Sequence, residues 1–340
     1  MKTQISFFEI KEQWQRELIK KQLPAAKFLV NTTDTKLTPA SAGKYKSADV
    51  IVVFIHSHVD EKVLSKTPKL KFIATSSTGY DHIDIAACKK RGIKVANVPF
   101  YGENTVAEHT FALILAITRK IVHSVNQTKQ GKFTLSGLRG FDLKGKTIGV
   151  VGTGHIGEHV IRIAHGFEMK ILAFDVKQNK ALENHYPLTY VTLDKLLSGS
   201  DITTIHAPYN QHTHHLINSN NLKKVKHGAI LINTSRGGLV DTSALFSALK
   251  SGRLGGAGLD VLEEEGIIGE ESELLVKSAD RDDLAAVVAA HKLLALDNVI
   301  VTPHNAFNSQ EAVERIMRTT LENILAWQKG KPQNTVESIK

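Results

Sequence analysis

The stretch Lys146–Gly157, with the sequence KTIGVVGTGHIG, decides the fold. Its first half is apolar and β-branched, which is typical of a buried strand, and Glu158–His165 has the pattern of a helix. The glycines between them have the spacing G-x-G-x-x-G. Gly152 permits a tight turn, Gly154 lets the backbone approach a pyrophosphate at the helix N-terminus, and Gly157 lets helix and strand pack closely. The stretch predicts a dinucleotide-binding unit; a structural glycine turn and a different nucleotide ligand are the alternatives.

The next predicted strand ends at an acidic residue that indicates which dinucleotide is bound. Asp175 lies 18 positions after Gly157, close to the ~20 at which a carboxylate binds the ribose 2′-hydroxyl. A carboxylate there repels a 2′-phosphate, so the sequence favours NAD over NADP. Lys177, two positions further on, weakens this preference.

Short apolar runs alternate with helical patterns along almost the whole chain. Runs rich in β-branched residues occur at Val50–Phe54, Phe72–Ala74, Thr147–Val151, Ile171–Phe174, Ile202–Ile205, Ala229–Asn233 and Val299–Thr302. Parallel strands buried on both faces have this composition, and their alternation with helices builds βαβ units. We therefore expect an α/β fold with parallel sheets.

Two long helical patterns flank the glycine-rich region. One runs from about Glu103 to Gln127, with Asn104 or Thr105 as its N-cap, and the other from about Gln310 to Lys329. A helix at each edge of a central unit suggests that the chain crosses twice between two domains. We therefore expect a discontinuous first domain and a second domain inserted into it.

The expected limits are residues 1–101 plus 304–340 for the first domain and 102–303 for the inserted one. Within the latter, Glu263–Ala295 is acidic at first and then helical. A connection of this length is usually functional or mobile, so we read it as an excursion from the compact fold.

Length and composition exclude several classes of protein. The 340 residues leave room for about two domains, and 42% hydrophobic with 23% charged residues exclude a disordered or fibrous chain. The longest apolar stretch, Val106–Ile117, is interrupted by Glu108 and His109, so no membrane helix is expected.

The N-terminal residues lack a signal-peptide core. A single cysteine, Cys88, excludes a disulfide framework, and we expect a cytoplasmic protein.

The net charge of +9 indicates anionic partners. Basic and acidic residues alternate along the chain, without a basic tail or interleaved aromatic residues, so nucleic-acid binding is the weaker interpretation. A small anionic substrate and a phosphate-bearing cofactor explain a mildly positive field equally well.

Three further predicted strands deliver charged side chains at their carboxyl ends: Arg236, Glu263–Glu265 and His304. In open α/β sheets this edge faces the ligand crevice. Arginine binds a carboxylate through its planar fork, and histidine transfers protons near neutral pH. A carboxylate beside the histidine favours its protonated form. With hydride from NADH, these groups predict the reduction of a 2-oxo acid.

The chain resembles the D-2-hydroxyacid dehydrogenase family over nearly its whole length. The resemblance is carried by Ser76–Asp84 (SSTGYDHID), Asn97–Pro99 with Thr105–His109, Gly149–Gly157, Thr234–Asp241, Gly258–Val261 and Pro303–Asn305. Within the family it looks most like the NAD-dependent D-lactate dehydrogenases, because of the GHIG form of the glycine loop and the aromatic Phe307. The resemblance implies two doubly wound parallel-sheet domains, with a Rossmann NAD domain inserted into a flavodoxin-like substrate domain. It also implies a homodimer.

The same resemblance implies a role for each site residue. Arg236 would bind the substrate, His304 would be the acid/base, and Glu265, five positions after Asp260, would support His304. Residues implied to bind NAD are Gly152, Gly154, His155, Ile156, Gly157, Asp175, His206, Ala207, Pro208, Thr213, Thr234, Ser235 and Asp260. The backbone of Ser77, Thr78 and Gly79 would receive the substrate carboxylate, and Phe54, Tyr101 and Phe307 would enclose the substrate side chain.

Two features leave the identity of the substrate undecided. The interval from Glu265 to His304, 39 positions, is long for a lactate enzyme, and three consecutive glutamates blur which one faces the histidine. We expect reduction of pyruvate to D-lactate. The alternatives are another 2-hydroxy acid such as glycerate or a branched-chain acid, phosphite, or an NAD-sensing corepressor-like interaction protein.

Four other histidines are expected neither to bind a metal nor to act in catalysis. We expect no metal site, because His212, His214 and His215 have no further ligand at suitable spacing and are interpreted as a solvated loop. His109 is interpreted as a core or interface residue rather than a catalytic one.

Overall fold

The chain forms two compact units. The computed structural model describes residues 2–263, 288 and 291–336. One unit comprises Met1–Tyr101 and Ser309–Lys340, and the other comprises Gly102–Asn308. The return to the first unit therefore follows Asn308, whereas the sequence analysis placed it before His304. The expected excursion Glu263–Ala295 lies largely outside the described residues.

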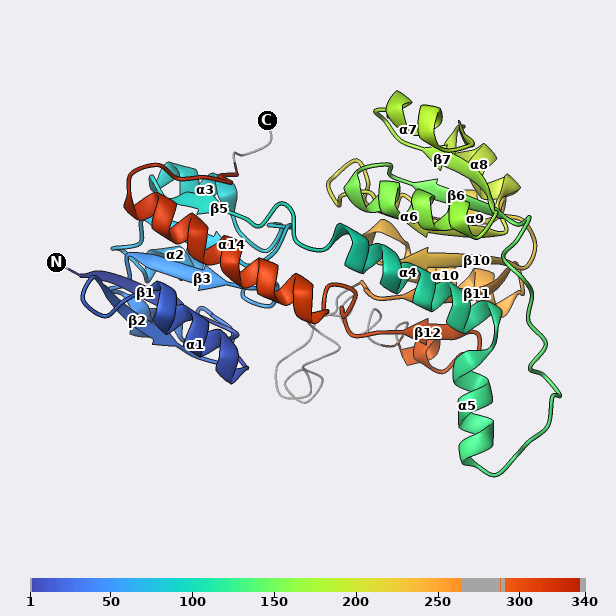
Figure 1. The fold of residues 1–340 in the computed structure, drawn as a ribbon, viewed down its shortest axis with the longest axis horizontal. Helices are drawn as coiled ribbons and strands as arrows, with labels where there is room; N and C mark the ends of the chain where they lie inside the picture. The colour runs from blue at the N-terminus through green and yellow to red at the C-terminus, as the bar shows by residue number, and fades with distance from the viewer. Residues whose placement is uncertain (1, 264–287, 289–290, 337–340) are drawn as a thin grey trace. The chain divides into compact units, whose positions relative to one another are not determined.

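The first unit contains a five-stranded parallel sheet in the order β2-β1-β3-β4-β5. Its strands are β1 (Thr3–Phe7), β2 (Phe28–Thr32), β3 (Val50–Val53), β4 (Phe72–Thr75) and β5 (Lys94–Ala96). Its helices are α1 (Gln13–Gln22), α2 (Glu61–Ser65), α3 (Ile85–Lys90) and α14 (Gln310–Gln328) (Figure 1). This strand order is that of flavodoxin-like folds, which confirms the predicted fold class of the unit.

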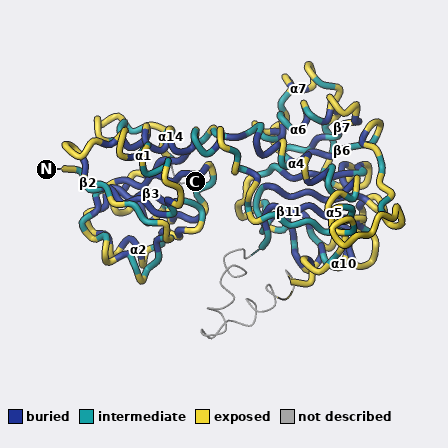
Figure 2. Tube along the Cα trace, turned by 60° about the horizontal axis from the view of Figure 1, so that its bottom comes forward, coloured by how far each residue is buried: buried dark blue, intermediate teal, exposed yellow. Residues whose placement is uncertain are grey.

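Strand β3 shows why this sheet needs helices on both faces. Val50 and Val52 belong to the apolar cluster that includes α1 and α14, while Ile51 and Val53 belong to the cluster that includes α2 and α3. Successive side chains of a strand point to opposite faces, so a continuous apolar run is buried from both sides. Figure 2 shows the strands of each unit as buried and the surrounding loops as exposed. Cys88 is one of these core residues, and burial raises the pKa of its thiol to about 12.

The second unit contains a seven-stranded parallel sheet in the order β12-β11-β10-β9-β6-β7-β8. Its strands are β6 (Thr147–Val151), β7 (Lys170–Phe174), β8 (Leu188–Tyr190), β9 (Ile202–Ile205), β10 (Ala229–Asn233), β11 (Leu254–Leu259) and β12 (Val299–Val301). Its helices include α4 (Glu103–Thr118), α5 (Ile121–Lys129), α6 (His155–Gly166), α7 (Lys180–His185), α8 (Leu193–Gly199), α9 (Ser219–Leu222) and α10 (Thr242–Lys250). The strand order reverses between β6 and β9, as in a doubly wound Rossmann fold, so this part of the predicted fold class is confirmed too.

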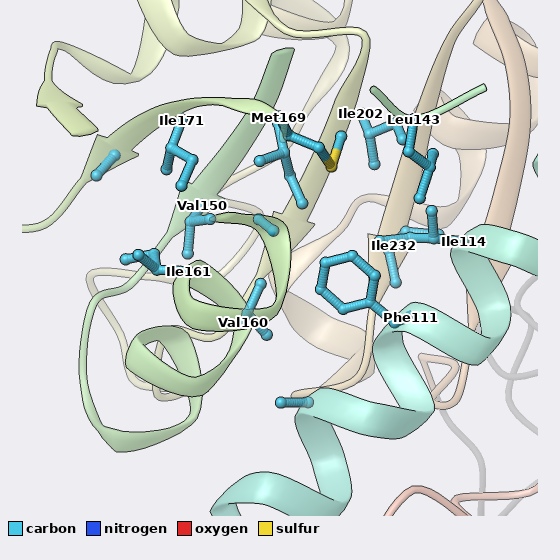
Figure 3. Packing of buried hydrophobic residues seen from close by; sticks show 14 of the residues in the cluster. Phe111, Ile114, Leu143, Val150, Val160, Ile161, Met169, Ile171, Ile202 and Ile232 are labelled. Atoms are coloured by element: carbon cyan, nitrogen blue, oxygen red, sulfur yellow. The ribbon is translucent and has the colours of Figure 1, made fainter. Parts of the chain in front are cut away.

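The two faces of this sheet have separate cores. Helices α4 and α6 pack together and contribute to one apolar cluster, and α8, α9 and α10 contribute to the other. Figure 3 shows Phe111 and Ile114 of α4 directed toward Ile232 of β10, with Val160 of α6 nearby. All five residues of β10 are buried, which explains its uninterrupted apolar sequence.

The helix predicted from Glu103 to Gln127 is two helices. Helix α4 ends at Thr118, Lys120 adopts the left-handed conformation at φ 54°, and α5 begins at Ile121. After α5 the chain comes back to the C-terminal end of α4 at Gly140 and Phe141. There, Phe141 N–H donates to the Thr118 carbonyl at 3.1 Å. This contact between residues distant in sequence takes up a carbonyl at the C-terminus of α4. The N-cap is Gly102, not Asn104 or Thr105, which lie inside the first turn.

The longest helix described is α14, with 19 residues; its buried residues, from Ala312 to Ile324, recur three to four positions apart along one face. Within the described part of the chain, no helix combines the length and the apolar character that crossing a membrane requires.

Candidate active site

Five strand ends of the second unit bring together the residues of the candidate active site. Strands β12, β11, β10, β9 and β6 are neighbours and parallel, so their carboxyl ends share one edge of the sheet. Gly152, His206, Arg236, Asp260 and His304 each follow one of these strands within a few residues. The edge includes the β6/β9 position at which the strand order reverses, where open α/β sheets bind their ligands.

The glycine loop fits a dinucleotide. Gly152 has φ 93°, and a Cβ on it would lie 2.7 Å from the carbonyl carbon of His206. A Cβ on Gly157 would lie 2.1 Å from the carbonyl oxygen of Gly152, so both positions exclude side chains. By contrast, a Cβ on Gly154 would meet no atom within 4 Å. Space for a pyrophosphate therefore lies where the loop meets the helix.

Helix α6 begins at this open position. Its first residues are His155 and Ile156, and its N-cap Gly154 provides no side-chain hydrogen bond. The helix is 12 residues long, so its N-terminus carries the partial positive charge that favours phosphate groups. Ile156 packs against the apolar core and His155 occupies the first turn.

Asp175 is fixed beside the glycine loop. One carboxylate oxygen accepts hydrogen bonds from Thr153 N–H at 2.6 Å and Thr153 Oγ1 at 3.1 Å, and the other accepts from Lys177 N–H at 2.9 Å. These bonds hold the carboxylate at the tip of β7. Lys177 contributes its backbone N–H to this arrangement.

The segment after β9 lies against the glycine loop. His206 N–H donates to the Val151 carbonyl at 2.7 Å, and its Nε2 lies 2.9 Å from Thr204 Oγ1. Burial lowers the pKa of His206 to about 3, so the ring is neutral at working pH. Its Nδ1 is buried with no partner among the described residues. In the same segment, Thr213 Oγ1 donates to the Pro208 carbonyl at 2.7 Å and closes the turn that follows Ala207.

The residues after β10 are tied to their neighbours through hydroxyl groups. Thr234 Oγ1 lies 3.0 Å from Thr110 Oγ1 of α4, and Ser235 Oγ donates to the Ile205 carbonyl at 2.9 Å. The Arg236 carbonyl accepts from Asn233 Nδ2 at 2.9 Å, and Arg236 Nη1 donates to the Ser235 carbonyl at 2.8 Å. This hydrogen-bonded turn positions the arginine at the strand end.

Asp260 is the most buried charged group of the site. Its side chain has 0% exposure, and its carboxylate accepts from Asn305 N–H and Ala306 N–H, both at 2.8 Å, and from Thr302 Oγ1 at 2.5 Å. His109 Nε2 lies 3.4 Å away. Burial alone would raise the pKa of Asp260, but these hydrogen bonds outweigh it and lower the pKa below its ordinary range. The predicted role of Asp260 was on the nicotinamide side; in the structure its carboxylate binds the histidine-bearing segment.

His304 sits in the loop that Asp260 holds. Its N–H donates to the Asp260 carbonyl at 2.8 Å and to the Thr302 carbonyl at 2.9 Å, and its φ is 50°, a left-handed value uncommon for a residue with a side chain. The Phe307 ring lies 6.5 Å from the imidazole, edge to face. Backbone strain that neighbouring bonds sustain is frequent at functional sites.

Glu265 lies outside the described residues, as does Glu264. The first of the three glutamates, Glu263, lies within the described residues, and both of its carboxylate oxygens have hydrogen-bond partners. Its Oε1 lies 2.5 Å from His215 Nε2, and its Oε2 accepts from Thr242 Oγ1 at 2.7 Å.

The residues predicted to receive the substrate carboxylate form a tight loop after β4 in the first unit. Ser77 Oγ donates to the Gly79 carbonyl at 2.7 Å, and Thr78 Oγ1 donates to the Val98 carbonyl at 2.8 Å. No described residue accepts a hydrogen bond from the backbone N–H of Ser77, Thr78 or Gly79. Successive N–H groups of this kind make an anion-binding concavity.

The two aromatic residues predicted for the substrate wall in the first unit are held at its strand ends. Phe54 N–H donates to Glu9 Oε1 at 3.3 Å, and its ring lies 6.4 Å from that of His56. The Tyr101 carbonyl accepts from Arg315 Nε.

The sequence analysis missed the contribution of two histidines. His109 Nε2 lies 3.0 Å from Thr302 Oγ1 as well as near Asp260, so this helix residue supports the His304 segment. His215 is not simply solvated, because it pairs with Glu263. Neither contact had a local signal, since each joins residues far apart in the chain.

Comparison with known proteins agrees with this geometry. Residues 111–306 match the model of the D-isomer specific 2-hydroxyacid dehydrogenase NAD binding domain. A D-lactate dehydrogenase of Curvularia clavata is 39% identical over 307 residues, 89% of this chain and 85% of the relative. A glyoxylate reductase of Korarchaeum cryptofilum is 34% identical over 333 residues, 96% and 91% of the two chains.

Solved structures give the same result. The D-lactate dehydrogenase from Aquifex aeolicus, complexed with NAD and lactic acid, superimposes with a TM-score of 0.88 at 34% identity and covers 99% of this chain and 100% of its own. With the Rossmann sheet, the glycine loop and the strand-end residues in place, the chain belongs to the D-isomer specific 2-hydroxyacid dehydrogenase family of NAD-dependent oxidoreductases.

Proposed function

We propose that the enzyme reduces pyruvate to D-lactate, with Arg236 as the substrate-binding cation and His304 as the acid/base. The observation that carries this proposal is the Asp260 network, which holds the His304 segment at the sheet edge where Arg236 also lies, with β11 between their two strands. The proposed cation and proton donor thus belong to neighbouring parts of one sheet edge.

The glycine loop, the N-terminus of α6 and Asp175 would hold NAD. When bound, NADH supplies the hydride that forms the new C–H bond at the substrate carbonyl carbon. Arg236 binds the substrate carboxylate and draws electron density toward the carbonyl oxygen, because a guanidinium offers paired N–H donors. His304, protonated, donates to that oxygen as the C=O π bond breaks, which leaves the imidazole neutral and the product a 2-hydroxy acid.

The preference for pyruvate over larger 2-oxo acids is supported by the aromatic ring next to the proposed proton donor. The Phe307 ring lies edge to face with the His304 imidazole. Relatives include both D-lactate dehydrogenases and glyoxylate reductases. Glyoxylate is therefore the second candidate substrate; it has a hydrogen where pyruvate has a methyl group.

The proposed setting is the cytoplasm. The single cysteine, Cys88, is buried and has no second cysteine in the chain with which to form a disulfide, which supports a reducing compartment.

We predict that His304→Gln lowers kcat for pyruvate by roughly 10²- to 10⁴-fold, the usual contribution of a positioned acid/base. Steady-state NADH oxidation with pyruvate, glyoxylate, hydroxypyruvate, phenylpyruvate and 2-oxoisocaproate measures both the loss and the preference. NADH affinity should stay near the wild-type value, and His212→Gln, at an exposed histidine, should behave as wild type. Wild-type turnover by His304→Gln would show that another group supplies the proton. A lower kcat/KM for pyruvate than for another acid of the panel would reject pyruvate as substrate.

The second prediction concerns the cofactor. Asp175→Asn keeps the shape of the side chain and removes the charge that repels a 2′-phosphate, so the preference for NADH over NADPH should fall by roughly tenfold or more. Kd values for both cofactors, measured by fluorescence titration, check this. Asp142→Asn, at an exposed acid of the same unit, is the matched control. An unchanged NADH/NADPH ratio in Asp175→Asn would mean that this carboxylate does not select the cofactor.

The proposed assembly is a homodimer that covers an exposed apolar segment. Phe133 and Leu135 are 87% and 86% exposed, and α5 has no buried residue although Ile121, Val122 and Val125 lie on it. Isolated apolar residues are common on surfaces, but a contiguous group usually marks an interface.

Sedimentation velocity at micromolar concentration should therefore show a dimer. The double variant Phe133→Asp/Leu135→Asp should shift it toward monomer, because two carboxylates would have to be buried. Leu29→Asp, at an exposed apolar residue of the first unit, is not expected to change the association state. A monomeric wild-type protein, or a double variant that remains dimeric, would contradict the assignment of this interface.

A further inference from the structure

Three segments meet at the turn that carries Arg236. The 3-10 turn Gly237–Leu239 follows the arginine directly. A Cβ on Gly237 would lie 2.1 Å from the carbonyl carbon of Leu262 and 2.3 Å from the Glu263 nitrogen. The backbone at Leu262–Glu263 therefore rests directly on the residue after Arg236. From the other side, His215 N–H donates to the Gly238 carbonyl at 2.8 Å.

The Glu263 side chain ties these segments together. Its Oε1 lies 2.5 Å from His215 Nε2, and its Oε2 accepts from Thr242 Oγ1 at 2.7 Å and from Thr242 N–H at 3.3 Å. The Glu263 and His215 side chains are 22% and 34% exposed, so water only partly competes for these bonds. Both carboxylate oxygens are used, which makes Glu263 unsuited to pair with His304.

This network is built between residues that the fold brings together from far apart. His215 is 48 positions from Glu263, and Thr242 is 21 positions from it. The His215 backbone also adopts a left-handed φ of 49°, a conformation that favours glycine or asparagine. His214, stacked on His215 at 3.9 Å and bonded to Tyr209 at 3.1 Å, covers the outer side of the pair.

We propose that His215, Thr242 and Glu263 form a clasp that positions Arg236 for the substrate carboxylate. Glu263 is thereby a positioning residue, distinct from the acid expected to support His304. The clasp acts through the Leu262–Glu263 backbone, which packs closely against Gly237 because this residue has no Cβ. A displacement of that backbone would therefore shift the adjacent arginine. This inference rests on the proposed role of Arg236.

The geometry predicts a selective kinetic effect. If the clasp is opened, the Leu262–Glu263 backbone can move from Gly237, and a displacement of about 1 Å at a substrate-positioning group can cost up to ~10²-fold in rate. The loss should appear chiefly as a higher KM for the 2-oxo acid. The Kd for NADH should change little, because the glycine loop and Asp175 are held by other bonds.

The test is a double-mutant cycle between the clasp and the arginine. Glu263→Ala should lower kcat/KM for pyruvate by roughly tenfold or more in the wild-type background, and Glu263→Gln, which retains an acceptor for Thr242, should recover part of it. In the Arg236→Lys background, Glu263→Ala should cause much less further loss, because the residue it positions is already changed. His212→Ala, in the same histidine-rich loop but bonded to its neighbour Gln211, should retain wild-type kinetics.

The outcomes separate this inference from the proposed function. If Arg236→Lys alone leaves pyruvate kinetics unchanged, the role of Arg236 fails. If Arg236→Lys impairs the enzyme but Glu263→Ala does not, or if the two losses simply multiply, the clasp proposal is overturned. Equal losses of pyruvate and NADH affinity would also overturn it, because they indicate a general structural effect. Should Glu263→Ala fail to fold, His215→Ala and Thr242→Val enter the same cycle with the same expected results.

Discussion

The carboxylate of Asp260 holds the segment that carries His304, and the arrangement of the candidate active site depends on this interaction. A carboxylate with no exposed side-chain surface must be compensated by hydrogen bonds. Here the compensation comes from two backbone N–H groups, a threonine hydroxyl and the nearby His109 ring. The groups that satisfy the charge are thus the groups that give the His304 loop its conformation, including its left-handed φ.

The same hydrogen bonds determine how the interaction responds to pH. Because they lower the pKa of Asp260 in the folded protein, folding favours the charged form. Its contribution to the free energy of unfolding is fully present above the ordinary aspartate pKa of about 4 and is lost as pH falls through the lower folded-state value. The Asp260 carboxylate is therefore charged, and able to accept these hydrogen bonds, throughout the range in which a histidine can exchange protons.

The sequence predicts those parts of the molecule that local pattern controls. Apolar runs and glycine spacing were enough to predict parallel strands in an α/β fold and the cofactor loop, since burial and turn geometry are encoded within a few residues. The two doubly wound sheets were expected from the family resemblance. The break at Lys120 was not predictable, because it follows from the return of Gly140 onto α4. Likewise, the partners of Asp260 in the His304 loop lie 42 to 46 positions away, and the partners of Glu263 lie 21 and 48 positions away. The positions of Arg236 and His304 at strand ends were expected, whereas the contacts that orient them required the structure.

The most direct measurement is the single-turnover rate of hydride transfer to pyruvate in Asp260→Asn, with NADH prebound. An asparagine amide cannot accept from both backbone N–H groups as the carboxylate does, so the His304 loop should lose its conformation. The account predicts a fall of roughly 10²-fold in this rate with NADH affinity retained. A hydride-transfer rate equal to that of the wild type would contradict it.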